Sequence, residues 1–210
     1  DENRHAGLLS REFRRLGLAR LGTGHWKTIQ AFIEAVDVVS NELIDADALE
    51  GDIGECYRAY LDTLDRYHFL TFGRLVALAV EELGDLDVFT RVHGSLRYLF
   101  VDEYQDVNPA QEKLVEILAT PPVELCVVGD DDQSIYQWRG SDVGNILTFA
   151  RRYEGATTAV LDTNRRSRPA IIATANRFAG SIAPRLPKTM APHRPAADVE
   201  VVPWKEETPE

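Results

Sequence analysis

The first part of the chain places its apolar residues at helical spacing. In the segment TFGRLVALAVEEL the apolar side chains recur every three or four positions, at Phe72, Leu75, Val76, Ala79 and Leu83. This period puts them on one face of a helix. Acidic stretches such as DADALEGD, residues 45–52, separate such helical segments. Residues 1 to about 92 are therefore predicted to be helical.

The pattern changes after Gly94. The run LRYLFVDE is short, apolar and ends in carboxylates, which is typical of a buried parallel strand. A helix is predicted to follow in NPAQEKLVEILA, because Asn108 can cap it, Pro109 fits its first turn and Gln111 can complete a capping box. The change of pattern near residue 93 indicates a domain boundary.

Strands and helices then continue to alternate. VELCVVGDDD is predicted to be a second strand that ends in carboxylates, GNILTFARRY an amphipathic helix, AVLDTN a third strand and RPAIIATANRFAG a further helix. Such alternation favours an α/β fold with a parallel sheet, in which ligands bind at the carboxyl ends of the strands. The Pro-rich segment IAPRLPKTMAPHRPAAD is predicted to be a loop, and Val199 to Trp204 a last strand.

Composition and charge narrow the class of protein. With 210 residues and 44% hydrophobic side chains, the chain can bury a core as one large domain or parts of two. Cys56 and Cys126 have neither disulfide nor metal-ligand spacing. No stretch approaches the roughly 18 apolar residues of a membrane helix, so we expect a cytoplasmic protein without a membrane partner. Because the net charge is −11, any contact with the phosphates of DNA is expected to be local.

The block VDEYQD, residues 101–106, ends the first predicted strand in two adjacent carboxylates. Asp102 can supply an oxygen ligand for Mg²⁺ and Glu103 a base or water-positioning group, which together serve nucleotide hydrolysis. The alternative is a helix N-terminus carrying acidic residues that the macrodipole favours. The neighbouring Gln105 and Asp106 favour the first interpretation.

The block GDDDQSIYQWRG begins at Gly129 and ends the second predicted strand in three carboxylates. Gln133 can sense a terminal phosphate without adding charge, and an exposed Trp138 can stack on a base of single-stranded nucleic acid. The alternative is that Tyr136 and Trp138 are partly buried anchors and that Arg139 pairs with the nearby acids.

The third block is TNRRSR, residues 163–168, at a predicted turn from strand to helix. Its three arginines can stabilise charge that develops on a transferred phosphoryl group, as an arginine finger does. A solvated basic cluster that complements the acidic surface is the alternative.

In this order and at these separations the three blocks resemble the second, third and fourth motifs of the UvrD/Rep family of superfamily 1 DNA helicases. The resemblance covers residues 96 to about 180. It implies a RecA-like parallel sheet core preceded by an all-helical insertion subdomain. Residues 1–92 would be the 1B-like insertion, 93–157 the C-terminal part of the first RecA-like domain (1A-like), and 158–210 the start of the second (2A-like).

The resemblance also implies a binding site for ATP and Mg²⁺. Asp102 would ligate Mg²⁺, and Glu103 would activate the attacking water. Gln133 would contact the γ-phosphate, and Arg166 would be the arginine finger. One position departs from the family, because Arg165 stands where its members usually have a tyrosine that stacks on adenine. A guanidinium plane can also stack on a base, so adenine binding would be altered rather than lost.

The same resemblance implies contacts with DNA. Tyr136 and Trp138 would face the DNA strand, and Arg139 would tie its motif to nearby carboxylates. The partners would be single-stranded DNA and duplex junctions.

The chain contains no phosphate-cradling loop GxxxxGK[ST], whose backbone N–H groups hold the phosphates and whose lysine bridges them. The nearest string is GTGHWKT, but Trp26 occupies the position of the obligatory glycine. No apolar strand precedes this string, so it is predicted to be an ordinary helix start.

We expect a parent protein that hydrolyses ATP to move along single-stranded DNA and separate duplexes. The remainder of the same polypeptide would carry the P-loop and the later helicase motifs. The 210-residue chain alone is expected to be inactive, because it lacks the main phosphate cradle. Two other classes stay open: a non-enzymatic DNA-binding or regulatory helicase relative that lacks a P-loop, and a P-loop ATPase acting on protein partners.

Overall fold

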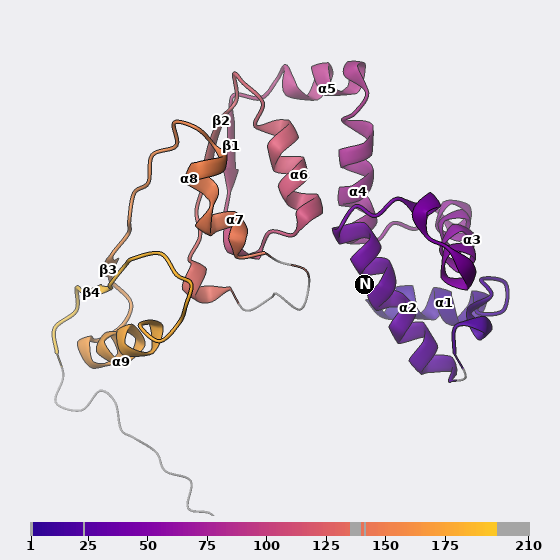
Figure 1. The fold of residues 1–210 in the computed structure, drawn as a ribbon, viewed down its shortest axis with the longest axis horizontal. Coiled ribbons are helices and arrows are strands. Elements are labelled where there is room, and N and C mark those ends of the chain that lie inside the picture. The colour runs from indigo at the N-terminus through magenta and orange to yellow at the C-terminus, as the bar shows by residue number, and fades with distance from the viewer. Residues whose placement is uncertain (1, 23, 135–139, 141, 197–210) are drawn as a thin grey trace, which may run out of the picture. The chain divides into compact units, whose positions relative to one another are not determined.

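The computed structural model describes residues 2–22, 24–134, 140 and 142–196. Contacts within the chain divide it into two compact units, Asp1–Gly129 with Ile135–Asp142 and Asp130–Ser134 with Val143–Glu210. The helices (α), 3-10 helices (η) and strands (β) follow one another as labelled in Figure 1: α1 Glu2–Glu12, η1 Leu18–Arg20, α2 His25–Asn41, η2 Ala46–Ala48, α3 Gly51–Tyr67, α4 Phe72–Glu82, α5 Leu86–His93, β1 Tyr98–Val101, η3 Tyr104–Asp106, α6 Pro109–Leu118, β2 Glu124–Val127, η4 Asp131–Gln133, α7 Gly144–Leu147, α8 Phe149–Arg152, β3 Thr163–Asn164, α9 Pro169–Ala179 and β4 Ala191–Pro192.

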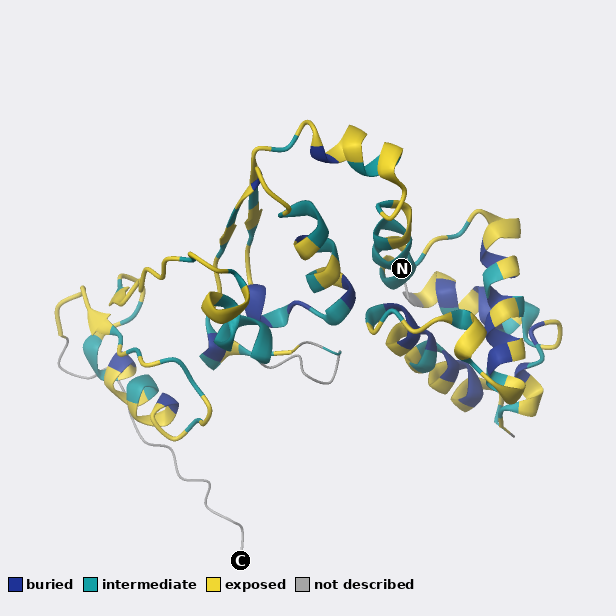
Figure 2. Cartoon of the chain, turned by 45° about the horizontal axis from the view of Figure 1, so that its top comes forward, coloured by how far each residue is buried: buried dark blue, intermediate teal, exposed yellow. Residues whose placement is uncertain are grey.

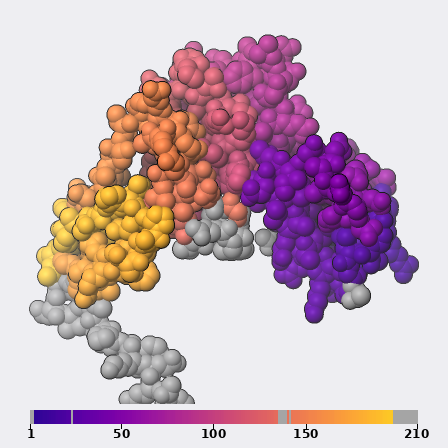
Figure 3. Space-filling view, in the orientation of Figure 1, coloured from indigo at the N-terminus to yellow at the C-terminus, as the bar shows by residue number. Residues whose placement is uncertain are grey.

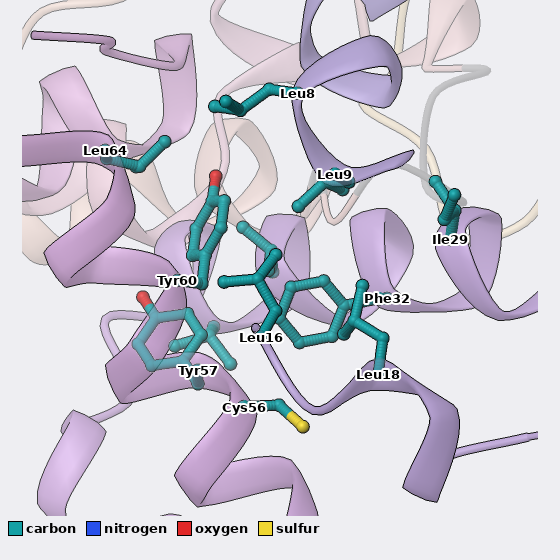
Figure 4. Packing of buried hydrophobic residues seen from close by; sticks show 12 residues of the cluster. Leu8, Leu9, Leu16, Leu18, Ile29, Phe32, Cys56, Tyr57, Tyr60 and Leu64 are labelled. Atoms are coloured by element: carbon teal, nitrogen blue, oxygen red, sulfur yellow. The ribbon is translucent and has the colours of Figure 1, made fainter. Parts of the chain in front are cut away.

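A hydrophobic core lies among α1, α2 and α3 in the first unit (Figure 4). Leu9, Phe32 and Tyr60 each contribute a side chain that is at most 2% exposed. Burying a large apolar side chain stabilises the folded state by roughly 1.5–3 kcal/mol. Figure 2 shows many of the buried residues in these helices, and Figure 3 draws the same part of the chain in indigo to purple. The helical region predicted from the sequence therefore has a core of its own.

Helix α4 is the helix predicted around residues 72–83. It begins where the side chain of Thr71 accepts a hydrogen bond from the backbone N–H of Arg74 at 3.3 Å. Its apolar face packs against α2 and α6 but is only partly covered, and Phe72 at its start is 84% exposed. The prediction of a helix is confirmed, and its apolar face is only partly buried.

Strands β1 and β2 pair in parallel, as the sequence predicts. Val101 at the end of β1 is in register with Val127 at the end of β2. The pairing continues beyond both strands, because Val128 N donates to Val101 O at 2.8 Å and Tyr104 N donates to Val128 O at 3.0 Å. The segment that follows β1 is thereby fastened to the end of β2.

Helix α6 starts with the predicted capping box. The side chain of Asn108 accepts a hydrogen bond from Gln111 N at 2.9 Å, and the side chain of Gln111 accepts one from Asn108 N at 3.1 Å. Pro109 occupies the first turn. Asn108 Nδ2 also donates to Asn41 Oδ1 at 3.0 Å, which ties the start of α6 to the end of α2.

The segment GNILTFARRY forms two short helices, α7 and α8, which corrects the prediction of one continuous helix. Thr148 lies between them with φ −106° and ψ 2°, outside α-helical values. Its hydroxyl donates to the carbonyl of Gly144 at 2.6 Å. A β-branched side chain that also bonds to the backbone lowers helix propensity, which accounts for the break.

The third predicted strand is short and pairs with a strand that the sequence pattern did not indicate. β3 lies parallel to β4, which falls within the segment predicted to be a loop. Ala191 N donates to Asp162 O at 2.8 Å, and His193 N donates to Asn164 O at 3.1 Å. Pro192 lies between these two donors, so its missing N–H removes no bond from the pairing.

The described residues form helices and short parallel strands, which confirms the α/β class. The RecA-like core, the helical insertion and the domain boundaries at 92/93 and 157/158 stay predictions. The strand predicted at Val199 to Trp204 lies outside the described residues. Within the described part of the chain, no helix combines the length and the apolarity that crossing a membrane requires.

Candidate functional site

The turn after β1 carries the carboxylates of the VDEYQD block. Asp102 and Glu103 are both exposed, and Asp102 Oδ1 accepts a hydrogen bond from Glu103 N at 2.9 Å. Glu103 has φ 51° and ψ 42°, in the left-handed region. Few residues other than glycine adopt this conformation, and its cost, of order 1–3 kcal/mol, must be offset by surrounding contacts. The turn is therefore held in shape by its neighbours.

Gln105 is one of those neighbours, and its side chain is 1% exposed. Its Nε2 donates to Glu103 Oε2 at 2.8 Å and lies 3.4 Å from Asp106 Oδ2. A buried amide that binds one carboxylate oxygen fixes the orientation of the whole carboxylate. The sequence singled out Gln105 only as a companion of the two acids. The sequence pattern did not indicate that Gln105, two residues after the exposed Glu103, would be buried.

Tyr104 anchors the same turn from inside the first unit. Its side chain is 0% exposed, and its hydroxyl donates to Glu112 Oε2 in α6 at 2.6 Å. Together with the bond from its backbone N–H to Val128, this contact fixes the turn to both α6 and the end of β2. Asp102 and Glu103 thus project from a rigid support.

The oxygen donors of this turn fit Mg²⁺. Asp102 offers an exposed carboxylate, and Asp106 Oδ1 is buried without a hydrogen-bond partner in the described part of the chain. No group of three or more metal-binding side chains occurs among the described residues. Mg²⁺ keeps several waters and is commonly held by one or two carboxylates together with substrate phosphates. A single ligand from Asp102 is compatible with that pattern.

The turn after β2 carries Asp130 to Gln133 and belongs to the second unit. Gln133 is exposed, and its Nε2 donates to Asp130 Oδ2 at 2.7 Å. Tyr136, Trp138 and Arg139 lie outside the described residues, so their implied contacts with DNA and carboxylates stay predictions.

Two basic residues that the sequence analysis did not select pair with this turn. Arg185 holds Asp132 through two hydrogen bonds, from Nε at 2.9 Å and from Nη2 at 2.6 Å. Lys188 Nζ lies 2.7 Å from Asp130 Oδ1 and also contacts Asp131. The only available signal was the need of three consecutive acids for counter-charges, and this need does not identify which cation serves it.

The ion pairs shift the pKa values of their members. The hydrogen bond from Arg185 lowers the pKa of Asp132, and the same contact raises the pKa of Arg185. Burial acts to raise the pKa of Asp130, but hydrogen bonds from Gln133 and Lys188 outweigh it, so this pKa is lowered. Burial opposes the charged form of Lys188, yet the carboxylates raise its pKa. All four groups are charged at neutral pH.

The TNRRSR block forms the turn between β3 and α9. Asn164 Oδ1 accepts hydrogen bonds from the backbone N–H groups of Arg166 at 3.0 Å and Ser167 at 2.8 Å, which shape the turn. Arg166 is exposed. Arg165 is exposed too, and its Nη1 lies 3.4 Å from His193 Nε2. The roles implied for these arginines toward ATP stay predictions.

The string GTGHWKT leads into α2, as predicted. Gly24 is the residue before the helix, and the helix begins at His25. The exposed Lys27 lies in its first turn. The structure thus places Asp102 and Glu103 in one turn of the first unit, and Gln133 and Arg166 in separate turns of the second.

Residues 22–154 match the UvrD/REP helicase N-terminal domain family. The ATP-dependent DNA helicase PcrA of Leuconostoc citreum is 39% identical over 145 residues, which cover 69% of this chain and 19% of that protein. PcrA of Staphylococcus aureus (strain Mu50 / ATCC 700699) is 38% identical over 166 residues, which cover 75% of this chain and 23% of that protein. The chain spans about a fifth of the length of these curated relatives. Since the family match extends over more than half of the chain, the protein belongs to the UvrD/Rep helicase family.

Proposed function

We propose that a protein containing this chain hydrolyses ATP to move along single-stranded DNA and to separate duplexes. The relatives named above are ATP-dependent DNA helicases, which supports this activity. The observation that carries the proposal is the turn after β1, where buried Gln105 holds the exposed Glu103 at the end of a parallel strand. Ligands of α/β sheets bind at this end of the strands.

In the proposed reaction Asp102 would hold Mg²⁺. Mg²⁺ supplies charge that offsets the charge developing on the phosphates. Glu103 accepts the proton of the attacking water. Gln105 binds Glu103 Oε2, and Oε1 is proposed to accept this proton.

Replacing Glu103 with Gln in the full-length protein tests this role. The substitution keeps the size of the side chain and removes the base, so the turnover number is expected to fall by about 10²-fold or more. ATP binding should change little. Glu116→Gln is the matched control, because Glu116 is an exposed glutamate of α6 that pairs only with surface Lys113 among the residues described. DNA-stimulated turnover near the wild-type value in Glu103→Gln would refute the assignment.

Gln133 and Arg166 are proposed to act on the γ-phosphate. Loss of an arginine finger lowers turnover by roughly 10³-fold or more, so Arg166→Ala is expected to do the same. The matched control is Arg177→Ala, since Arg177 is an exposed arginine in the last turn of α9. Equal turnover in the two arginine variants would contradict the role of Arg166. Arg165 is proposed to stack on the base, with altered preference among nucleotides as the consequence.

Contact with DNA is proposed to be local, because the chain carries a net charge of −11. Tyr136 and Trp138 would stack on bases, an interaction worth roughly 1–3 kcal/mol per base, and Arg139 would hold their segment to nearby carboxylates. Trp138→Ala should weaken binding of single-stranded DNA without ATP. Trp26→Ala, at a 63% exposed position on α2, should leave the affinity unchanged.

The remainder of the polypeptide is proposed to complete the nucleotide site and the sheet. The chain has no GxxxxGK[ST] loop, so we expect no ATPase activity from the 210-residue chain alone. Tyr98 and Phe100 on one face of β1 are 63% and 72% exposed, whereas parallel sheets are normally covered on both faces. Steady turnover of Mg·ATP by the purified chain would contradict this expectation.

A further inference from the structure

The turn that carries Gln133 is held by the loop after α9. Three consecutive carboxylates, Asp130 to Asp132, face the two cations Arg185 and Lys188. More than fifty residues of sequence separate the partners, and all of them belong to the second unit. The arrangement is more than a surface ion pair, because the side chain of Asp131 is only 1% exposed.

One carboxylate of this cluster links Lys188 to Gln133. Lys188 Nζ lies 2.7 Å from Asp130 Oδ1, and Gln133 Nε2 donates to Asp130 Oδ2 at 2.7 Å. Asp130 is therefore held from both sides. A primary amide has two N–H donors, so Gln133 Nε2 keeps a second donor for an acceptor such as a phosphate oxygen.

The side chains of Asp131 and Asp132 are held by the same loop. Asp131 Oδ2 accepts a hydrogen bond from Leu186 N at 2.7 Å, and its other oxygen contacts Lys188. Asp132 is bound by two of the three nitrogens of Arg185, Nε and Nη2, a geometry that fixes direction as well as distance. The loop after α9 thus binds the carboxylate before η4 and the two carboxylates within it. Gln133 is the last residue of η4.

We propose that Lys188 is a positioning residue for Gln133, with Arg185 as a second support: Lys188 orients Asp130, and Asp130 orients the side-chain amide that contacts the γ-phosphate. This inference rests on the proposed role of Gln133. By this inference the loop after α9 contributes to the preference of the protein for ATP over ADP. A purely structural role would instead anchor the loop without affecting that distinction.

The test compares affinities for a non-hydrolysable ATP analogue and for ADP in the full-length protein. Gln133→Ala should reduce the preference for the ATP analogue by about tenfold, the loss expected for one hydrogen bond to a charged group. Lys188→Met should reduce it to a similar extent, and the double variant should lose no more than either single variant. Lys188→Arg should restore part of the preference. Lys113→Met, at an exposed lysine of α6, is the matched control and should leave it unchanged.

Asp130→Asn provides a second variant in case Lys188→Met does not fold, because it weakens the same link while keeping the shape of the side chain. Loss of ATP preference in this variant, with an unchanged melting temperature, supports positioning. A normal preference in Lys188→Met or Asp130→Asn, while Gln133→Ala has lost it, overturns the positioning role and leaves the proposed function intact. A normal preference in Gln133→Ala removes the sensor role and the inference together. Additive losses in the double variant also overturn it.

Discussion

The helices α1 to α3 and the turns after β1 and β2 are stabilised in different ways. The helices bury a cluster that includes Leu9, Phe32 and Tyr60, each at most 2% exposed, so apolar burial holds them together. The strands leave Phe100 72% exposed, and the turns that follow them depend on hydrogen bonds and ion pairs. A region with its own core can tolerate changes elsewhere in the chain, whereas the candidate site depends on a few specific polar partners.

The two regions also differ in whether their buried polar groups have hydrogen-bond partners. In the helical core the buried His5 and Tyr60 satisfy each other through a hydrogen bond of 2.9 Å. In the turn after β1, Asp106 Oδ1 is buried without a hydrogen-bond partner among the described residues. Unsatisfied buried groups occur at functional sites, where they can serve binding or catalysis.

The largest effect is expected from emptying the helical core. Phe32→Ala should lower the free energy of unfolding by about 3–5 kcal/mol, because it removes a buried aromatic ring and leaves a cavity. Urea unfolding followed by circular dichroism measures the loss. Phe178→Ala is the control, since Phe178 is 72% exposed in α9 and should change stability by less than about 0.5 kcal/mol. Equal losses in the two variants would mean that burial of Phe32 in the core is not a main source of the free energy of unfolding.

A smaller effect is expected at the ion-pair cluster of the second unit. Lys188→Met should cost about 2 kcal/mol, because it leaves the buried Asp131 without its main counter-charge; the partial exposure of Lys188 keeps the cost below that of a fully buried pair. Amide hydrogen exchange should show faster opening around residues 185–192 and unchanged exchange in α2. Lys113→Met serves as the control. Unchanged exchange in the loop would show that the cluster contributes nothing to local stability.

Removing one hydroxyl under the turn after β1 should cost less. Tyr104→Phe deletes the hydrogen bond to Glu112 and keeps the buried ring, so the free energy of unfolding should fall by about 1 kcal/mol. Tyr98→Phe, at a residue that is 63% exposed in the 210-residue chain, should have no measurable effect when both variants are made in that chain. Thermal unfolding of the two variants in parallel gives the comparison. A loss as large as that of Phe32→Ala would place the turn within the core.

The smallest effect is expected in the pH dependence of the stability of the helical region. Burial lowers the pKa of His5 below its ordinary value of 6.5. The neutral form is therefore favoured by folding, so its contribution is present above pH 6.5 and is lost as pH falls through the lowered pKa. His5→Gln should flatten the dependence of stability on pH below 6.5. His68→Asn, at an exposed position, should retain the wild-type slope. An unchanged slope in His5→Gln would assign the dependence to other groups.

The sequence by itself determined the features that depend on neighbouring residues. The capping box of Asn108 and Gln111, the parallel strands β1 and β2, and the helix at 72–82 all follow from local spacing and side-chain chemistry. The order of the blocks also carried the resemblance to the family that residues 22–154 match. Short-range patterns are sufficient here, because caps and alternating strands and helices use residues close in sequence.

Only the tertiary structure decided which distant residues meet. Arg185 and Lys188 lie in a segment predicted to be a loop. β4 lies in the same segment and pairs with β3. No local pattern distinguishes these cations from others of the chain, because an ion pair requires proximity in space and not a sequence interval. Gln105 was likewise decided by packing, since burial of a polar side chain becomes favourable only when acceptors such as Glu103 are already in place.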